Sequence, residues 1–259
     1  MSRSTLIALV VVAIVAVGIG GYLAYDTFLR GDSVPALALP SSSPEAGAST
    51  TPSTAATAEP SAAASEAADP SASADAGSSD LAGVWTVAAA EAGYRVREQL
   101  ANLPAESDAV GRTDAVTGSI TLAGDGDAVQ LTEGSLEVDT TTITSDEGRR
   151  DNRMRSEGLE TDAFPTATFV ITQPLDVPAA ALAGTATDVT LVGDLTLHGV
   201  TQSVEIPARA QLVDGQVQVA GSYTFPLGEF DIVAPNVGGF IVSIADEGAL
   251  EFLVAFSQG

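Results

Sequence analysis

Apolar and polar residues alternate along the C-terminal half of the chain, as is typical of β-strands with one buried face. The alternation is regular over residues 189–197, reverses its parity after Gly199 and continues over residues 200–212. A tight turn at His198-Gly199 would bring both apolar sets onto one face, so the pattern predicts a hairpin. The register of this hairpin pairs apolar residues throughout: Leu197 with Val200, Leu191 with Ile206 and Val189 with Ala208.

The same period of two predicts further strands on both sides of this hairpin. Asp214-Gly215 is a strong signal for a second tight turn, which would pair Leu212 with Val217. Similar alternation occurs in YRVRE, TATFVIT and GALEFLVAF, which gives eight or nine strands and one short helical candidate. Such strands must pack on a second sheet or close into an antiparallel barrel of about eight strands. The alternation identifies the buried face, and both a filled and a hollow interior fit it.

The first 30 residues form a separate part of the chain. Residues 6–23 carry no charge and form a run of 18 apolar or glycine residues. At about 1.5 Å per residue this run just crosses a hydrocarbon layer of roughly 30 Å. We therefore expect a membrane anchor at residues 1–30, with a transmembrane helix at about residues 6–25. The alternative is a signal peptide cleaved near the ALA sequence at residues 36–38.

Both alternatives place the rest of the protein outside the cytoplasm, either as a single-pass protein of the cell membrane or as a secreted protein. Residues 31–80 consist almost entirely of Ala, Ser, Thr, Pro, Gly and acidic residues. Because such a segment buries too little apolar surface to offset its ordering entropy, we expect a disordered linker. Residues 81–259 then form the folded domain. The formal net charge of −24 argues against nucleic acid as a partner.

The stretch SDEGRRDNRMRSEG, residues 145–158, collects four of the ten basic residues of the chain. A short helix capped by Ser145 or Asp146 would provide three ion pairs at i,i+4 spacing: Asp146 with Arg150, Asp151 with Arg155 and Arg153 with Glu157. Two interpretations remain open, a salt-bridged cap over the barrel or a set of arginines that binds a phosphate or pyrophosphate. Arg149 is the least paired of the four and is the best anion-binding candidate.

His198 is the only histidine of the chain. Alternation points it outward together with Asp194 and Ser203, an arrangement that would allow a catalytic triad. The glycine that follows favours a turn instead, and contact with a ligand at the barrel rim is a further interpretation. We predict no catalytic residue, no enzyme activity and no metal site, since the chain has no cysteine and no metal-ligand spacing.

Several motifs together resemble the YceI-like polyisoprenoid-binding family. They are RRDNRMRS, FPTATF and LVGDLTLHGVTQSVEI, between an opening GVWTVAAAEAGYRVRE and a closing EGALEFLVAF, so that the resemblance covers residues 83–256. It implies a lipocalin-like antiparallel β-barrel around a long apolar tunnel for an isoprenoid chain, in an exported protein without established catalytic machinery. The chain departs from the family pattern at Arg153, where many relatives carry histidine, and at residues 227–232 (LGEFDI).

The sequence thus predicts a membrane-tethered, extracytoplasmic protein that sequesters or carries an isoprenoid or similar long-chain lipid. No cofactor is expected apart from a bound isoprenoid or isoprenoid quinone as ligand, and the N-terminal helix makes the membrane a partner. The alternative is a non-liganded envelope stress or protein-interaction barrel with a filled core. The candidate headgroup residues are Arg149, Arg153 and His198. The candidate tunnel-lining residues are Tyr94, Val96, Ile120, Phe164, Phe169, Ile171, Leu195, Leu197, Tyr223, Phe225, Phe240 and Phe252.

Overall fold

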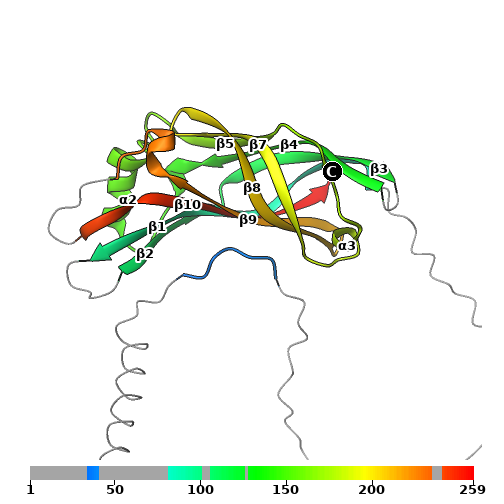
Figure 1. Ribbon diagram of the computed structural model, residues 1–259, viewed down its shortest axis with the longest axis horizontal. Helices are drawn as coiled ribbons and strands as arrows, with labels where there is room; N and C mark the ends of the chain where they lie inside the picture. The colour runs from blue at the N-terminus through cyan, green and yellow to red at the C-terminus, as the bar shows by residue number, and fades with distance from the viewer. Residues whose placement is uncertain (1–33, 41–80, 101–105, 126–127, 235–240) are drawn as a thin grey trace, which may run out of the picture.

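We describe the fold from a computed structural model of the protein (Figure 1). The expected transmembrane segment, most of the expected linker and Phe240 lie outside the residues that the structure describes. Within those residues, no helix combines the length and the apolar character needed to cross a bilayer. The described stretches are residues 34–40, 81–100, 106–125, 128–234 and 241–259.

Ten antiparallel strands make up most of the described chain. They are β1 (Gly83–Leu100), β2 (Glu106–Thr113), β3 (Val116–Asp125), β4 (Ala128–Asp139), β5 (Thr166–Ile171), β6 (Leu175–Asp176), β7 (Thr187–Leu197), β8 (Val200–Val213), β9 (Gln216–Pro226) and β10 (Ile241–Gln258). Short helical segments connect some of them: η1 (Thr140–Thr142), α2 (Gly148–Arg153), the π-helical η2 (Met154–Gly158), α3 (Ala179–Leu182) and η3 (Leu227–Phe230).

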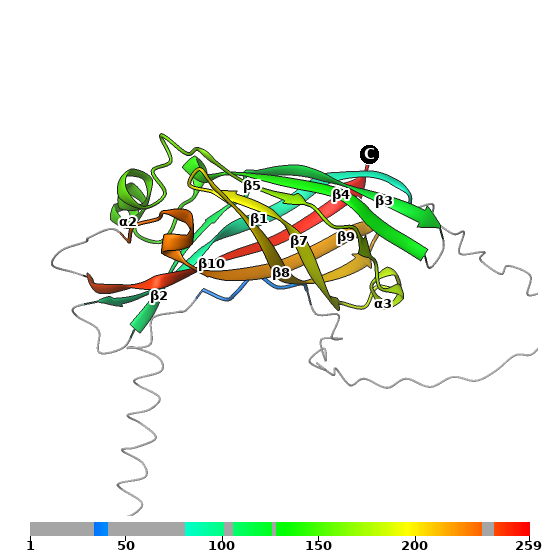
Figure 2. The same cartoon turned by 45° about the horizontal axis from the view of Figure 1, so that its top comes forward.

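Eight of the strands form a closed ring in the order β1, β3, β4, β5, β7, β8, β9, β10, because β10 also pairs with β1. β1 is long enough to pair with β10 along one edge and with both β3 and β2 along the other. The ring is an elongated barrel (Figures 1 and 2). The predicted all-β antiparallel barrel of about eight strands, with a short helix, is confirmed.

The registers predicted from the alternation are confirmed. β7 and β8 join Leu197 to Val200, Leu191 to Ile206 and Val189 to Ala208, and β8 and β9 join Leu212 to Val217. Both turns use left-handed backbone, with φ of 50° at His198, 75° at Gly199, 53° at Asp214 and 73° at Gly215. Two consecutive residues of positive φ characterise the type I′ turn, whose twist suits a two-residue hairpin.

The inward faces of the ring strands form one apolar core. Trp85, Phe230 and Val254 are its most deeply buried large side chains. α2, η2 and η3 lie at one end of the barrel, and α3 lies at the other (Figures 1 and 2). The barrel is therefore an apolar tube with helical segments at both ends, so a ligand that enters at an end must pass one of these segments.

Residues 34–40, which fall within the expected linker, lie against the outside of the barrel (Figure 1). They have no regular secondary structure. We call this segment the strap. Its Leu39 is 8% exposed, so at least one of its side chains is packed as tightly as a core residue.

Candidate functional site

Two apolar chambers lie inside the barrel. Chamber 1, with a volume of about 80 Å³, extends toward α3, whose Ala181 and Leu182 border it. Chamber 2, with a volume of about 130 Å³, extends toward η2 and η3, from which Met154 and Leu227 border it. An apolar cavity of roughly 150 Å³ accepts a benzene-sized molecule. Each chamber is therefore large enough for a short apolar group but too small for a long chain.

Four residues border both chambers and form the constriction between them: Leu136, Phe169, Leu191 and Phe252. The two phenylalanine rings lie over glycines of neighbouring strands. A Cβ atom on Gly193 would lie 2.7 Å from Cζ of Phe169, and one on Gly221 would lie 2.6 Å from Cζ of Phe252. The missing side chains of these glycines give the rings room against the barrel wall.

Ten of the twelve predicted tunnel-lining residues border a chamber, so the alternation located the interior well. Phe164 is not among the lining residues. Its ring packs on His198 instead, with centroids 4.4 Å apart. Phe240 lies outside the described residues. Contact of these side chains with a lipid stays a prediction.

Tyr94 introduces a polar group into the wall of chamber 2. Its hydroxyl oxygen Oη is buried and has no hydrogen-bond partner among the described residues. Burial raises the pKa of Tyr94 to about 12, with opposing contributions from the nearby Arg150 and acidic groups. The phenol therefore stays protonated and can donate a hydrogen bond to an acceptor that enters the chamber.

Arg150 fastens α2 to the barrel. Its Nη2 atom lies 2.7 Å from Oε1 of Glu98 on β1, a carboxylate that is 3% exposed, and its Nη1 atom pairs with Asp146. Breaking a buried pair of this kind leaves an uncompensated charge, which is far more costly than losing a surface pair. The interpretation of the arginine cluster as a salt-bridged cap is thus supported for Arg150.

The other predicted contacts of the cluster are partly wrong. The pair Arg153–Glu157 forms at 2.8 Å. Asp151, however, accepts hydrogen bonds from the backbone and hydroxyl of Ser145, and Arg155 donates to the carbonyl of Ile143. The side chain that caps α2 is Glu147 rather than Ser145 or Asp146, because Ser145 is held by Asp151. Arg149 is exposed, with no ion pair among the described residues.

The prediction that His198 points outward is wrong, although the predicted turn is present. The side chain is 7% exposed. Its Nδ1 lies 3.1 Å from the carbonyl oxygen of Phe230 in η3, and its Nε2 lies 2.9 Å from Oε2 of Glu160 after η2. His198 therefore ties the β7–β8 turn to both segments that cover chamber 2. Asp194 and Ser203 are register partners across β7 and β8, as the predicted hairpin requires, but the nitrogens of His198 contact neither of them.

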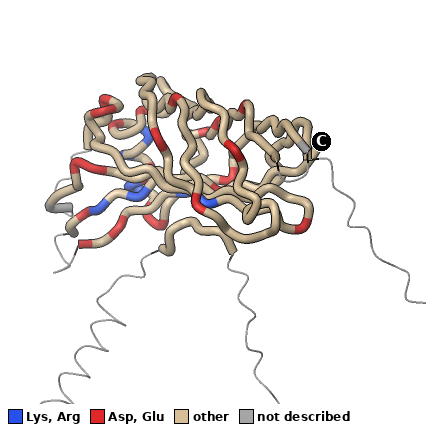
Figure 3. Tube along the Cα trace, turned by 45° about the vertical axis from the view of Figure 1, so that its right-hand side comes forward, with Lys and Arg blue, Asp and Glu red and all other residues tan. Residues whose placement is uncertain are grey.

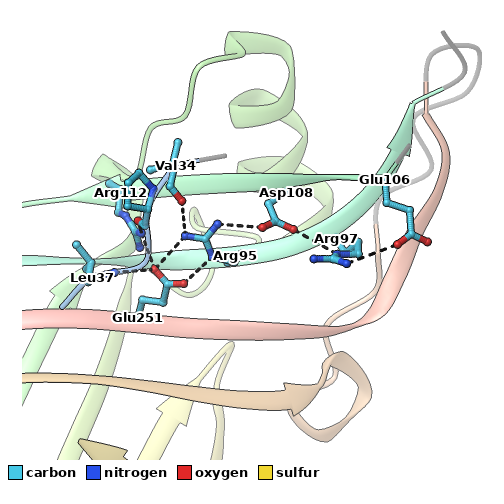
Figure 4. Close-up of polar contacts among 9 residues, drawn as sticks. Val34, Leu37, Arg95, Arg97, Glu106, Asp108, Arg112 and Glu251 are labelled. Atoms are coloured by element: carbon cyan, nitrogen blue, oxygen red, sulfur yellow. Dashed lines mark hydrogen bonds and ion pairs between the residues drawn. The ribbon is translucent and has the colours of Figure 1, made fainter. Parts of the chain in front are cut away.

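A second polar cluster lies on the outer face of the barrel, where β10, β1 and β2 meet (Figure 4). Glu251, only 4% exposed, lies 2.6 Å from Nε of Arg95 and pairs also with Arg112. Arg95 continues to Asp108 at 3.1 Å. Glu251 and Arg112 are both register partners of Gly93, so they meet over a residue that has no side chain.

The cluster changes the properties of Glu251. Burial alone would raise the pKa of Glu251, but the hydrogen bonds from Arg95 and Arg112 hold it below its usual value. The few basic residues of the barrel gather mostly toward the end away from the C-terminus, among many acidic ones (Figure 3). In this cluster, arginines and carboxylates offset each other's charge, although the protein as a whole is acidic.

Sequence reasoning missed several residues of the interior. The α3 segment (AAAL) gives no amphipathic signal because it is only four residues long. The two glycines beneath the phenylalanine rings also escaped notice, since a glycine in a strand does not reveal which side chain lies over it. The outer cluster could be suspected only once the pairing of β1 with both β2 and β10 was known.

Comparison with known proteins agrees with this geometry. The sequence matches the model of the YceI-like domain family over residues 85–256. A UPF0312 protein from Shewanella denitrificans is 34% identical over 102 residues, which are 38% of this chain and 48% of the relative. The chain thus spans about half the length of this curated relative.

A solved structure has the same fold. It is a polyisoprenoid-binding domain from Saccharophagus degradans, with a TM-score of 0.54 and 20% sequence identity. The match covers 68% of this chain and 98% of that domain. At this level of identity the likeness shows the shared barrel.

The constriction can be tested with Phe252→Ala. We expect this change to join the two chambers and to lower the free energy of unfolding by about 3 kcal/mol, the lower end of the range for deletion of a large aromatic side chain. The matched variant is Gly221→Ala, whose Cβ would push the same ring into the bore. Urea unfolding gives the stability, and ¹²⁹Xe NMR reports the void. Increased xenon uptake in Phe252→Ala and decreased uptake in Gly221→Ala are expected; equal responses would contradict the assignment.

The outer cluster predicts a pH dependence of stability. Because the pKa of folded Glu251 lies below its usual value of about 4.5, its carboxylate stabilises the fold above that pH, and this contribution is lost as the pH falls through the folded pKa. Glu251→Gln should lower the free energy of unfolding by about 3 kcal/mol near neutral pH. The difference from the wild type should shrink below about pH 4.5.

Urea unfolding between about pH 3 and pH 8 measures this difference. The control is Glu106→Gln, because Glu106 makes a longer ion pair of 3.7 Å with the exposed Arg97. Its replacement should change stability by less than about 1 kcal/mol. If the difference in free energy of unfolding between the wild type and Glu251→Gln stays constant down to about pH 3, the fold does not hold the Glu251 carboxylate in its charged form.

Proposed function

Since the chain belongs to the YceI-like domain family, we propose that it binds an isoprenoid or similar long-chain lipid inside its barrel. The polyisoprenoid-binding domain that shares the fold supports this ligand class. The observation that carries the proposal is the pair of apolar chambers, which together extend along the barrel from η2 and η3 to α3. Transfer of each CH2 group from water into such an interior is worth about 0.8 kcal/mol.

A long chain would have to pass the constriction. Phe169 and Phe252 are the rings that stand between the chambers, and both are only half-buried. Rotation of these rings would join the two voids without breaking a strand pairing. We therefore propose that the chain of the lipid passes between the two rings. It would replace the contacts that the rings make with the other residues of the constriction.

The polar end of the ligand would lie in chamber 2. Tyr94 is a donor without a partner in the wall of this chamber, and Arg150 is near enough to affect its titration. A hydroxyl, quinone carbonyl or phosphate oxygen placed there would satisfy the phenol. Arg149 and Arg153 on the neighbouring helix remain candidates for a larger anionic headgroup, whereas both nitrogens of His198 already have partners.

We further propose that the protein acts outside the cytoplasm, tethered to the cell membrane by residues 1–30. The apolar run at residues 6–23 supports the tether. Isoprenoid lipids reside in the bilayer, so a tethered barrel would meet its ligand at the membrane surface and shield it from water. The protein would thus sequester or carry the lipid without changing it chemically.

One observation favours a second function. The chambers, at about 80 Å³ and 130 Å³, are smaller than the roughly 300–1,000 Å³ of usual ligand pockets. A barrel whose interior stays closed would be an envelope stress or protein-interaction module. The two functions differ in whether the interior opens, which is measurable.

Recovery of a ligand tests the first function directly. We expect protein purified from its native membrane without added lipid, then extracted with organic solvent, to release an isoprenoid that mass spectrometry identifies at up to one molecule per barrel. Phe252→Asp, which puts a charge into the constriction, should release much less. If no lipid is recovered and added isoprenoid quinone is not taken up, the closed barrel is the better account.

The polar end is tested with Tyr94→Phe, which removes one hydroxyl and keeps the ring. We expect affinity for an isoprenoid quinone or alcohol to fall about tenfold, as for loss of one hydrogen bond of about 1–1.5 kcal/mol, and affinity for the matching hydrocarbon to stay unchanged. Fluorescence titration measures both. In the comparison variant, with Arg149→Ala and Arg153→Ala together, the affinity for a diphosphate lipid should fall more than the affinity for the alcohol. Equal losses for the quinone and the hydrocarbon would rule out Tyr94 as the polar contact.

A further inference from the structure

The strap is fixed to the outer cluster by its backbone. The Nη2 atom of Arg95 donates to the carbonyl of Val34 at 2.8 Å, and Nη2 of Arg112 donates to the carbonyl of Pro35 at 3.4 Å. The backbone N–H of Leu37 donates to Oε2 of Glu251 at 3.4 Å (Figure 4). Three charged side chains from three strands thus bind backbone groups of three residues of the strap.

The chemistry of these contacts is complementary. The backbone of the strap offers carbonyl acceptors and N–H donors, and the cluster offers guanidinium donors next to a carboxylate acceptor. Glu251 is 4% exposed although it points away from the barrel interior, and a charge so well shielded needs all of its hydrogen bonds. The strap supplies one of these hydrogen bonds through the N–H of Leu37, and Arg95 and Arg112 supply the others.

Apolar contacts continue the attachment beyond the cluster. Leu37 and Leu39 border a groove on the outside of the barrel together with Pro207 of β8 and Ala220 of β9. Leu39 is 8% exposed and Ala220 only 5%. Leu39 and Ala220 are thus buried residues in the walls of one groove, which the strap forms together with this face of the barrel.

We propose that the strap is a docking element that holds the barrel next to the membrane and turns the β1, β2 and β10 side toward it. This rests on the membrane tether of the proposed function. Only ten residues, 24–33, separate the apolar run from the strap, against 57 residues up to the barrel itself. At about 3.6 Å per residue the strap stays within about 40 Å of the end of the apolar run, whereas an undocked linker could extend to about 200 Å.

The strap also contains the ALA sequence at residues 36–38. Cleavage after Ala38 would remove the groups of Val34, Pro35 and Leu37 that bind the cluster. A docked strap and a chain processed at this site exclude each other. The N-terminus of the mature protein therefore bears directly on the proposal, and a mature chain that begins at Leu39 would overturn it.

Docking itself is tested on the full chain in detergent by hydrogen exchange. We expect the N–H of Leu37 to exchange much more slowly than that of an unstructured peptide, and Leu39→Ser to speed this exchange by about tenfold or more, because a buried leucine holds the strap in place. Val34→Ser is the matched control, since Val34 is 47% exposed and its carbonyl makes the contact with Arg95. Fast exchange of Leu37 in the wild type, or equal effects of the two variants, would overturn the docking.

The distance is tested on the full chain in phosphatidylcholine vesicles. The chain has no cysteine, so Glu205→Cys on the exposed face of β8 carries a single donor fluorophore, and a labelled lipid is the acceptor. We expect Leu39→Ser to lower energy transfer to the bilayer and Val34→Ser to leave it unchanged. Unchanged transfer in both variants, with Leu37 protected, would overturn the membrane proximity and leave docking standing. A chain that does not float with vesicles would overturn the tether as well, whereas loss of lipid binding inside the barrel would affect neither measurement.

Discussion

Closure of the ring through the pairing of β10 with β1 commits the apolar half of every ring strand to one shared interior. Alternation has a period of two, so a slip of one residue in any pair would turn a whole apolar set toward water. The two type I′ turns at His198-Gly199 and Asp214-Gly215 fix the register of three successive strands. Strand closure therefore creates both the core that stabilises the fold and the cavity that could hold a ligand.

The interior is divided by large side chains, and their placement depends on two glycines. Phe169 lies over Gly193 and Phe252 lies over Gly221. A residue with a side chain at either glycine position would clash with the ring. Apolar walls bind an oily chain through transfer from water and need few polar contacts. This accounts for a site made mainly of aliphatic and aromatic residues, in which Tyr94 carries a buried hydroxyl without a hydrogen-bond partner among the described residues.

The alternation predicts most of the strands and the two hairpin registers, and ten of the twelve candidate lining residues do border a chamber, because period-two burial leaves a direct record in the sequence. Contacts between distant segments left no such record. Alternation predicts an outward-pointing His198, because parity does not reveal that Glu160 and Phe230 cover its turn. Composition predicts that the strap is part of a linker. It does not reveal the cluster that binds the strap backbone, because that cluster comes from β1, β2 and β10, far along the chain.

We propose that the apolar interior opens between Phe169 and Phe252 to admit the chain of a lipid. Determining the structure of the protein after saturation with an isoprenoid quinone tests this most directly. The account predicts continuous density for the isoprenoid through both chambers, with the two rings turned away from the bore and the quinone ring beside Tyr94. Density for the lipid only outside the barrel, with the rings in their present positions and both chambers empty, would contradict it.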